Sequence, residues 1–192
     1  MARLAIVPAS PRWPTEFALV AAELGRVLGA VALRIDHVGS TSVPGLDAKD
    51  VIDVQVAVGG LADLAPASED LARAGYRVTF PARDHPVPGQ PTDEVAWIKL
   101  FAAEPVGARR VHVHVRVAGA PNHRYALLFR DYLRRHPDTA KAYEVFKRRA
   151  AHLLVDDAAT YADLKDPVCD LIFLPALTWA EQTSWTVPAP PG

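Results

Sequence analysis

Two stretches of the chain alternate strictly between apolar and polar residues, and this pattern limits the possible folds more than any other feature. In 51–58 the apolar positions are Ile52, Val54, Val56 and Val58. In 111–117 four valines alternate with His112, His114 and Arg116. Successive side chains of a β-strand point to opposite faces of the sheet. Both stretches are therefore predicted as strands with one apolar face against helices and one polar face.

The polar faces of these strands carry the first candidate site. Asp53 interrupts an otherwise aliphatic strand, where a short acid lowers strand propensity, and this favours a functional role. Together with Gln55 and the His-x-His-x-Arg triplet it would line a partly open polar groove. The alternative stays open that the triplet marks an ordinary solvent-facing side of an antiparallel sheet.

The rest of the chain reads as helices and further strands. Helices are predicted over 14–29, 61–74, 122–135, 138–153 and 166–183, and strands over 31–37, 76–80, 94–101 and 109–117. The last two strands are expected to form an antiparallel hairpin that turns near Gly107. The order predicts an α/β or α+β fold with a mixed sheet and a helical C-terminal half. We expect one domain over 1–187, followed by a flexible proline-rich tail over 188–192.

The composition limits the kinds of partner and the cellular location that are expected for the chain. The 192 residues carry 21 Lys and Arg against 22 Asp and Glu, so the charge does not call for a nucleic-acid or membrane partner. Cys169 is the single cysteine, which rules out an intramolecular disulfide and a cysteine-only metal site. No apolar window approaches the ~20 residues that span a bilayer. The expected location is the cytoplasm.

The turn "GSTSVPG" at 39–45 precedes the Asp53 strand. Backbone N–H groups and hydroxyls in such a turn can hold phosphate oxygens. No Walker loop occurs, so the turn is not that of a kinase. A Gly-Ser turn shortly before an acid-bearing strand resembles the nucleotidyltransferase superfamily of the DNA polymerase β type. There the Gly-Ser pair holds a nucleotide phosphate and strand carboxylates hold Mg²⁺.

A longer set of motifs resembles the GrpB family over nearly the whole chain. The motifs are "DHVGSTSVPGLDAKDVIDVQV", "VHVHV", "LLFRDYLRRHP", "AYEVFKRR" and "YADLK". The likeness is nearest to the GrpB-like domain fused to some bacterial dephospho-CoA kinases. It implies a nucleotidyltransferase-like fold, with the Gly-Ser motif at Gly39 and Ser40 and the first acid at Asp53.

When the acid positions of the superfamily are matched to this sequence, two of the carboxylates are missing. The superfamily's second acid would stand at Gln55, and 111–117 holds no third acid, because His114 occupies the histidine position of the family. An amide cannot supply the second negative charge that a polymerase-type metal site uses, so two-metal nucleotidyl transfer is in doubt.

Three functional hypotheses follow. The first is binding of a nucleotide or other phosphorylated metabolite, with Mg²⁺ or Mn²⁺ at Asp53 and with Asp53 and His114 as catalytic candidates. Its ligand-binding candidates are Gly39, Ser40, Thr41, Ser42, Lys49, Gln55, Lys99, His112 and Arg116. The second is a non-catalytic partner of a dephospho-CoA kinase, which rests on analogy with the fused proteins. The third is a transition-metal site made of Asp53, His112 and His114.

Several residues keep two interpretations. Tyr143 and Lys147, one helical turn apart, could line the groove or face solvent, and Lys165 has the same status. Arg130 and Asp131 are expected to fix a helix against the sheet. His37 is expected to support the turn through a hydrogen bond. The four tryptophans are predicted to be packing anchors rather than a stacking platform for bases.

Overall fold

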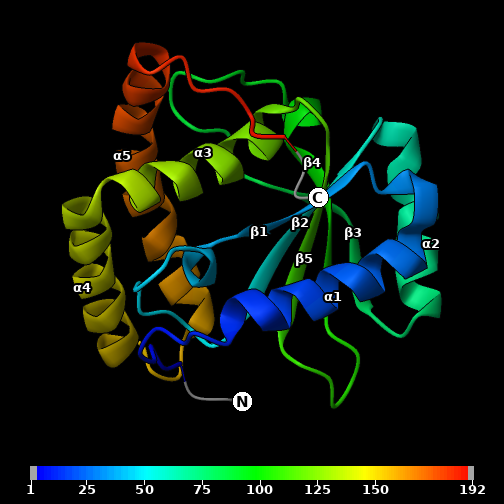
Figure 1. The fold of residues 1–192 in the computed structure, drawn as a ribbon, viewed down its shortest axis with the longest axis horizontal. Coiled ribbons are helices and arrows are strands. Elements are labelled where there is room, and N and C mark those ends of the chain that lie inside the picture. Colours follow the sequence, from blue (N-terminus) through cyan, green and yellow to red (C-terminus); the bar gives the residue numbers. More distant parts are fainter. Residues whose placement is uncertain (1–3, 190–192) are drawn as a thin grey trace.

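A computed structural model describes residues 4–189 of the chain (Figure 1). The five strands are β1 (Arg34–Val38), β2 (Ile52–Val58), β3 (Arg77–Arg83), β4 (Ile98–Ala103) and β5 (Val111–Val117). They form one sheet in the order β1-β2-β5-β4-β3. The β2–β5 pair is parallel, while the other pairs are antiparallel. The predicted mixed sheet and the β4–β5 hairpin are therefore confirmed.

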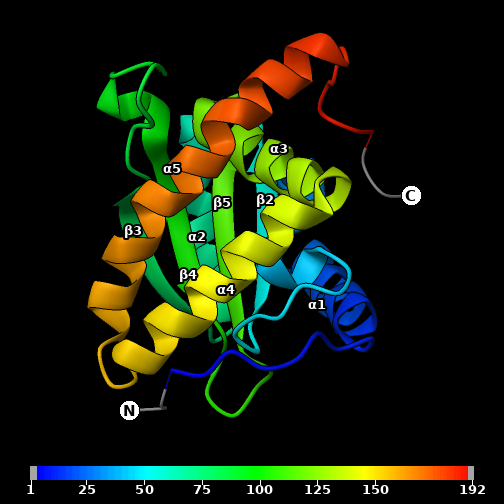
Figure 2. The ribbon, with the colours of Figure 1, turned by 90° about the vertical axis from the view of Figure 1, so that its left-hand side faces the viewer.

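Helices cover both faces of this sheet. They are α1 (Trp13–Leu28), α2 (Leu64–Arg73), α3 (Pro121–Arg135), α4 (Pro137–Leu153) and α5 (Ala158–Gln182). In Figure 1, α1 and α2 lie on one side of the strands and α3, α4 and α5 on the other. The view in Figure 2 looks onto the second group, which crosses in front of the sheet. The α+β class with a helical C-terminal half is confirmed.

The apolar faces of the two alternating strands build the main core. All four aliphatic residues of β2 at even positions are fully buried, as are Val113 and Val115 of β5. They pack with Leu24 of α1 and Leu71 of α2 in one cluster. Burial of each such side chain stabilises the fold by roughly 1.5–3 kcal/mol, which fixes the strand register and turns the polar positions toward α3 and α5.

Two element boundaries differ from the predictions. The segment 94–97, expected as strand, is a 3₁₀-helix because the Asp93 side chain accepts a hydrogen bond from Val95 N at 3.0 Å. Helix α5 begins at Ala158 rather than 166 and contains two prolines. The Asp157 side chain caps it by accepting from Thr160 N at 3.0 Å, a start signal that the sequence reading missed.

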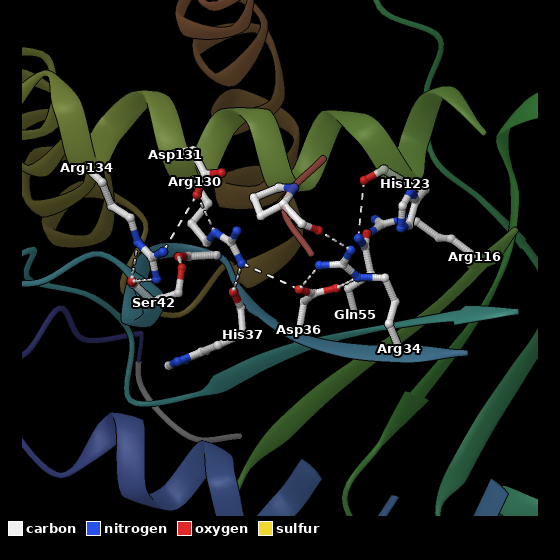
Figure 3. Close-up of polar contacts among 12 residues, drawn as sticks. Arg34, Asp36, His37, Ser42, Gln55, Arg116, His123, Arg130, Asp131 and Arg134 are labelled. Atoms are coloured by element: carbon white, nitrogen blue, oxygen red, sulfur yellow. Dashed lines mark hydrogen bonds and ion pairs between the residues drawn. The ribbon is translucent and has the colours of Figure 1, made fainter. Parts of the chain in front are cut away.

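Helix α3 is attached to β1 and to the turn after it by arginines, of which Arg130 is buried and Arg134 is exposed (Figure 3). Arg130 Nη1 donates to His37 O at 3.1 Å and lies 3.8 Å from the Asp36 carboxylate, which also pairs with Arg34 at 2.5 Å. Arg134 donates twice to Ser42 O, at 3.1 and 2.7 Å. The prediction that Arg130 fixes a helix against the sheet is confirmed. The attachment sets the height of α3 above β1 and β2.

The end of the described chain lies against β1. Pro188 O accepts a hydrogen bond from Arg34 Nη1 at 2.6 Å, so the first residue of the predicted tail has a defined contact. Residues 190–192 of that tail lie outside the described residues. Among residues 4–189, no helix combines the length and apolar character needed to cross a bilayer.

Candidate functional site

The turn that follows β1 lies directly against the Asp53 carboxylate. Gly39 has a φ of 67°, and a Cβ placed on it would come 2.3 Å from Asp53 Oδ2. Only glycine both adopts this backbone conformation readily and leaves space for the carboxylate. The glycine of the Gly-Ser motif therefore allows the backbone of the turn to lie directly against β2.

The hydroxyls of the turn are used largely to hold its shape. Thr41 Oγ1 lies 3.0 Å from His37 Nε2 and donates to Val51 O at 3.3 Å. Ser42 Oγ donates to Gly39 O at 2.6 Å. The His37 ring stacks on Phe17 with 4.7 Å between centroids, and burial lowers the pKa of His37 to about 4. The expected support of the turn by His37 is confirmed, with a neutral imidazole at pH 7.

A cavity of about 480 Å³ opens between this turn, the polar faces of β2 and β5, and helices α3, α4 and α5. Nine of the eleven site residues predicted from sequence line it. These are Gly39, Ser40, Thr41, Lys49, Asp53, Lys99, His112, His114 and Arg116. The alternation of β2 and β5 thus gathers residues far apart in sequence on one cavity floor.

Ser42 and Gln55, also predicted as ligand-binding residues, do not line this cavity. Gln55 is fully buried beneath α3, where Nε2 donates to His123 O at 3.2 Å and Oε1 accepts from Arg116 Nη1 at 2.7 Å (Figure 3). Its amide thus joins sheet to helix and orients Arg116. Ser42 uses both its hydroxyl and its carbonyl oxygen within the fold.

Asp53 and His112 are neighbours across the parallel pair. Their register pairs them directly, and His112 Nδ1 lies 3.3 Å from Asp53 Oδ1. Burial alone would raise the pKa of Asp53, but the hydrogen bond and charge of His112, with His114 and Lys165, lower that pKa to about 2. The site therefore holds an ionised carboxylate at neutral pH.

His114 lies farther along β5 and faces cations. Its Nδ1 is 3.4 Å from Lys99 Nζ, and its ring contacts Phe101 edge-on at 5.4 Å between centroids. Burial, followed by the charges of Lys99 and Arg116, lowers the pKa of His114 well below its ordinary value. These surroundings disfavour protonation of the imidazole, which can accept a hydrogen bond in its neutral form.

Asp84 completes the charged group around Lys99. It accepts from Arg116 Nε at 2.9 Å and from Lys99 Nζ. Burial alone would raise the pKa of Asp84, but Arg116 and Lys99 lower it below the ordinary carboxyl value. The sequence reading missed Asp84, because it belongs to the proline-rich segment after β3 and nothing local indicates its distant partners.

Besides Lys99, three lysines line the cavity: Lys49, Lys147 and Lys165. Lys147 of α4 is 2% exposed, donates to Asp47 O at 2.6 Å and lies 4.7 Å from the centre of the Tyr143 ring. Lys49 lies 4.9 Å from the centre of the Tyr161 ring. Burial, then the charge of Lys165, lowers the pKa of Lys147 to about 7 and also lowers the pKa of Lys49. The cavity interpretation of Lys147 and Lys165 thus fits the structure better than a solvated face.

The wall opposite the sheet is aromatic. It includes Trp97, Tyr125, Phe129, Tyr143 and Tyr161. Trp97 is 2% exposed and donates to Pro91 O at 2.7 Å, so it is a packing anchor as predicted, although one edge also lines the cavity. Asn122, at the start of α3, adds a buried Oδ1 without a hydrogen-bond partner among the described residues. The cavity therefore offers a charged floor and an apolar roof.

The lining has an excess of positive charge. Six Lys and Arg residues line the cavity against three Asp residues. The cations are Lys49, Arg83, Lys99, Arg116, Lys147 and Lys165, and the anions are Asp53, Asp84 and Asp166. The whole chain has a net charge of −1. The fold therefore concentrates positive charge in this cavity.

A metal bound by Asp53, His112 and His114 does not fit these residues. Residues 4–189 hold no group of three or more His, Cys, Asp or Glu side chains arranged to bind a metal ion. The ring of His114 lies beside the Lys99 ammonium and has its centroid 6.5 Å from that of His112. A cation this close opposes a second cation at the same imidazole. The three side chains therefore do not form a ready ligand set.

Comparison with known proteins shows which family the chain resembles. The family model described as "GrpB protein" matches residues 3–173. The chain belongs to the GrpB family. The solved GrpB structure from Enterococcus faecalis covers 91% of this chain and 98% of its own, with a TM-score of 0.74 and 27% identity. The solved GrpB structure thus confirms the mixed sheet with flanking helices that the GrpB resemblance implied.

Curated relatives of this GrpB chain are of two kinds. A dephospho-CoA kinase of Mycobacterium leprae is 34% identical over 94% of this chain, which spans 48% of that relative. A UPF0157 protein of Pseudomonas aeruginosa is 36% identical over 86% of this chain and 64% of its own length. The chain thus spans about half the length of the kinases that it matches.

Proposed function

We propose that this GrpB chain binds a nucleotide or another phosphorylated small molecule in the cavity between β2, β5 and the C-terminal helices. The phosphates would lie beside the turn of Gly39, Ser40 and Thr41. The apolar part of the ligand would lie against the aromatic roof. Asn122 Oδ1 would accept a hydrogen bond from a donor on the ligand.

The excess of positive charge in the cavity lining carries this proposal. Cations buried without equal negative charge are costly in an apolar setting, and that cost is recovered when an anion binds between them. A phosphate offers several acceptor oxygens and more than one negative charge. A neutral or cationic ligand would leave the lysines of the cavity without compensation.

The names of the relatives suggest which ligands to try first. Several are called dephospho-CoA kinases. Dephospho-CoA combines an adenine nucleotide, a diphosphate and a long flexible arm, which suits a cavity lined by both charged and aromatic side chains. We therefore rank such precursors beside free nucleotides.

Binding can be tested by thermal unfolding of the full chain. Nucleoside mono-, di- and triphosphates, dephospho-CoA and phosphosugars are added singly, with Mg²⁺, with Mn²⁺ or with a chelator. A ligand at 100 times its Kd stabilises the folded state by about 2.7 kcal/mol. We expect at least one phosphorylated ligand to raise the unfolding temperature, whereas its dephosphorylated counterpart does not. No rise with any of them would refute the proposal.

Transfer chemistry is measured in the same samples. Asp53 and His114 are the candidate catalytic residues, with Asp53 the single ionised carboxylate at the turn. Release of pyrophosphate or formation of a nucleotidylated product that disappears in Asp53→Asn would establish a transferase. Binding without turnover would leave a ligand-binding domain.

A second candidate function is that of a partner of a dephospho-CoA kinase. It is favoured by the relatives in which a region matching this chain is about half of a longer protein of that name. Co-purification of the full chain with a separately expressed dephospho-CoA kinase tests it. A stable complex, or a changed kinase rate, is the expected result, and the absence of both refutes this second function.

A further inference from the structure

Lys49, Lys147 and Lys165 reach the cavity from three different parts of the chain. Lys49 follows the turn that packs on Asp53, Lys147 comes from α4, and Lys165 comes from α5. All three line the cavity together with Asp53. Three lysines thus lie in a lining that carries six Lys and Arg residues against three Asp residues.

None of the three lysines forms an ion pair within residues 4–189. Lys147 Nζ has the Asp47 carbonyl and the Tyr143 ring as neighbours. Lys49 Nζ has the Tyr161 ring. Carbonyl dipoles and aromatic faces stabilise an ammonium group only partly compared with a carboxylate.

Two carboxylates whose charges act on Lys147 pair with other cations. Glu144 pairs with Lys141 at 2.5 Å and lies 3.9 Å from Arg148. The Asp47 carboxylate accepts from Ala9 N at 2.8 Å and also pairs with Arg148. Asp53 and Asp166 are the carboxylates whose charges act on Lys165. Glu144 and Asp47, beside Lys147, are therefore engaged by other cations, and the lysines share the charges of Asp53 and Asp166 without an ion pair.

Uncompensated buried charges of one sign need a partner of the opposite sign. A resident divalent cation would add to the positive charge of this region. The polymerase-type arrangement uses a divalent ion to neutralise phosphate charge between several carboxylates, and here one carboxylate remains.

We propose that Lys49, Lys147 and Lys165 neutralise the phosphates of the bound ligand directly, in place of a divalent metal ion. This inference rests on the proposed function and specifies how that function is achieved. Asp53 then orients His112 and the turn. Phosphate binding would accordingly need no Mg²⁺ or Mn²⁺.

The test uses sodium pyrophosphate as the probe and isothermal titration of the full chain. Titrations are run in a chelator and again in excess Mg²⁺. We expect the affinity in chelator to equal or exceed that in Mg²⁺, because Mg²⁺ competes for the probe. Binding only in the presence of Mg²⁺ overturns the inference while the proposed function stands. No binding in either condition also overturns the inference, and the ligand panel then judges the proposed function separately.

Three variants test the lysines themselves: Lys49→Met, Lys147→Met and Lys165→Met. Each should bind pyrophosphate about tenfold or more weakly, as expected for loss of a charge-assisted contact. Arg73→Met is the matched control, because Arg73 is exposed on α2 at the opposite face of the sheet. Its affinity should not change.

Unfolding without ligand separates this role from a purely structural one. Because burial and neighbouring cations lower the pKa of Lys49 and Lys147 when no anion is present, Lys49→Met and Lys147→Met should each unfold at the same temperature as the wild type or higher. A structural lysine would show the reverse, with lower stability and unchanged affinity. That second result would overturn the inference.

Discussion

The Cβ position of Gly39 lies 2.3 Å from Oδ2 of Asp53, so the two residues leave no room for a side chain between turn and strand. The close approach holds the backbone of the turn beside an ionised carboxylate. It also explains why a glycine with positive φ begins the Gly-Ser motif.

Gly39→Ala should displace the turn and destabilise the fold. The new methyl group meets Asp53 and also adopts an unfavourable backbone conformation, so the free energy of unfolding should fall by about 2–4 kcal/mol. Chemical denaturation measures this loss. Gly45→Ala is the control, since Gly45 has a φ of 75° but nothing within 4 Å of its Cβ position. Equal losses in both variants would contradict the role of the close approach.

Asp36→Ala should be among the most damaging changes outside the cavity. Asp36 is 3% exposed and pairs with Arg34 and Arg130, which would be left buried without a counter-ion. We expect a loss of about 3–5 kcal/mol in the free energy of unfolding. Glu69→Ala, which removes an exposed pair with Arg73, should change it by less than about 1 kcal/mol. Similar effects of the two changes would show that the arginine attachment of α3 is dispensable.

His37 should make the protein less stable in mild acid. Burial lowers the pKa of His37 from 6.5 to about 4, so the unfolded chain takes up a proton first as the pH falls. Its contribution is complete above pH 6.5 and is lost between pH 6.5 and about 4. The shift corresponds to roughly 3 kcal/mol. His37→Gln should reduce the acid-induced loss measured by denaturation, whereas the exposed His152→Gln should not.

Lys147 should give ligand binding a pH dependence near neutrality. Burial and Lys165 lower the pKa of Lys147 to about 7, so its ammonium loses its proton as the pH rises through that value. Pyrophosphate affinity should therefore fall above pH 7, with a midpoint moved upward by the bound anion. Titration calorimetry from pH 6 to 9 measures it. Lys147→Arg keeps its charge and should flatten the profile, and an unchanged profile in that variant would exclude Lys147 as the source.

Stability without ligand should change with pH in the opposite direction. The folded state favours neutral Lys147, and the unfolded chain keeps its proton up to the ordinary lysine pKa of 10.5. The contribution of this residue to stability therefore rises between pH 7 and pH 10.5. As the pH rises above 7, Lys147 should thus weaken pyrophosphate binding and strengthen its contribution to stability. This pair of opposite pH trends is expected for a buried lysine without an ion pair.

The sequence predicted the cavity floor well because a strand has a simple period. Alternation alone places Asp53, His112 and His114 on one face of β2 and β5. Alternation could not show that Gln55 lies beneath α3. The polar face of β2 is open to the cavity at Asp53 but is covered by α3 at Gln55. Coverage depends on where helices 60 or more residues away come to lie.

The helical wall was harder to predict. Lys147 and Lys165 lie on helices whose sequence allows either a solvated or a buried face, and the choice depends on packing between α4, α5 and the turn. Asp84 carries no local signal at all. Long-range ion pairs such as Asp84 with Arg116 form only when the hairpin and the loop meet.

Strand β2 contributes to both the main core and the cavity, and this limits how the cavity can change shape. Its even residues are fully buried between α1 and α2, while its odd residue Asp53 faces the cavity. Close-packed interiors resist compression, so the floor cannot yield to a ligand without disturbing the main core. Any adjustment to ligands of different size must come from the helical wall and the loop that carries Asp84. The floor of the cavity is thus rigid, and the helical wall and the Asp84 loop are the parts that can adjust.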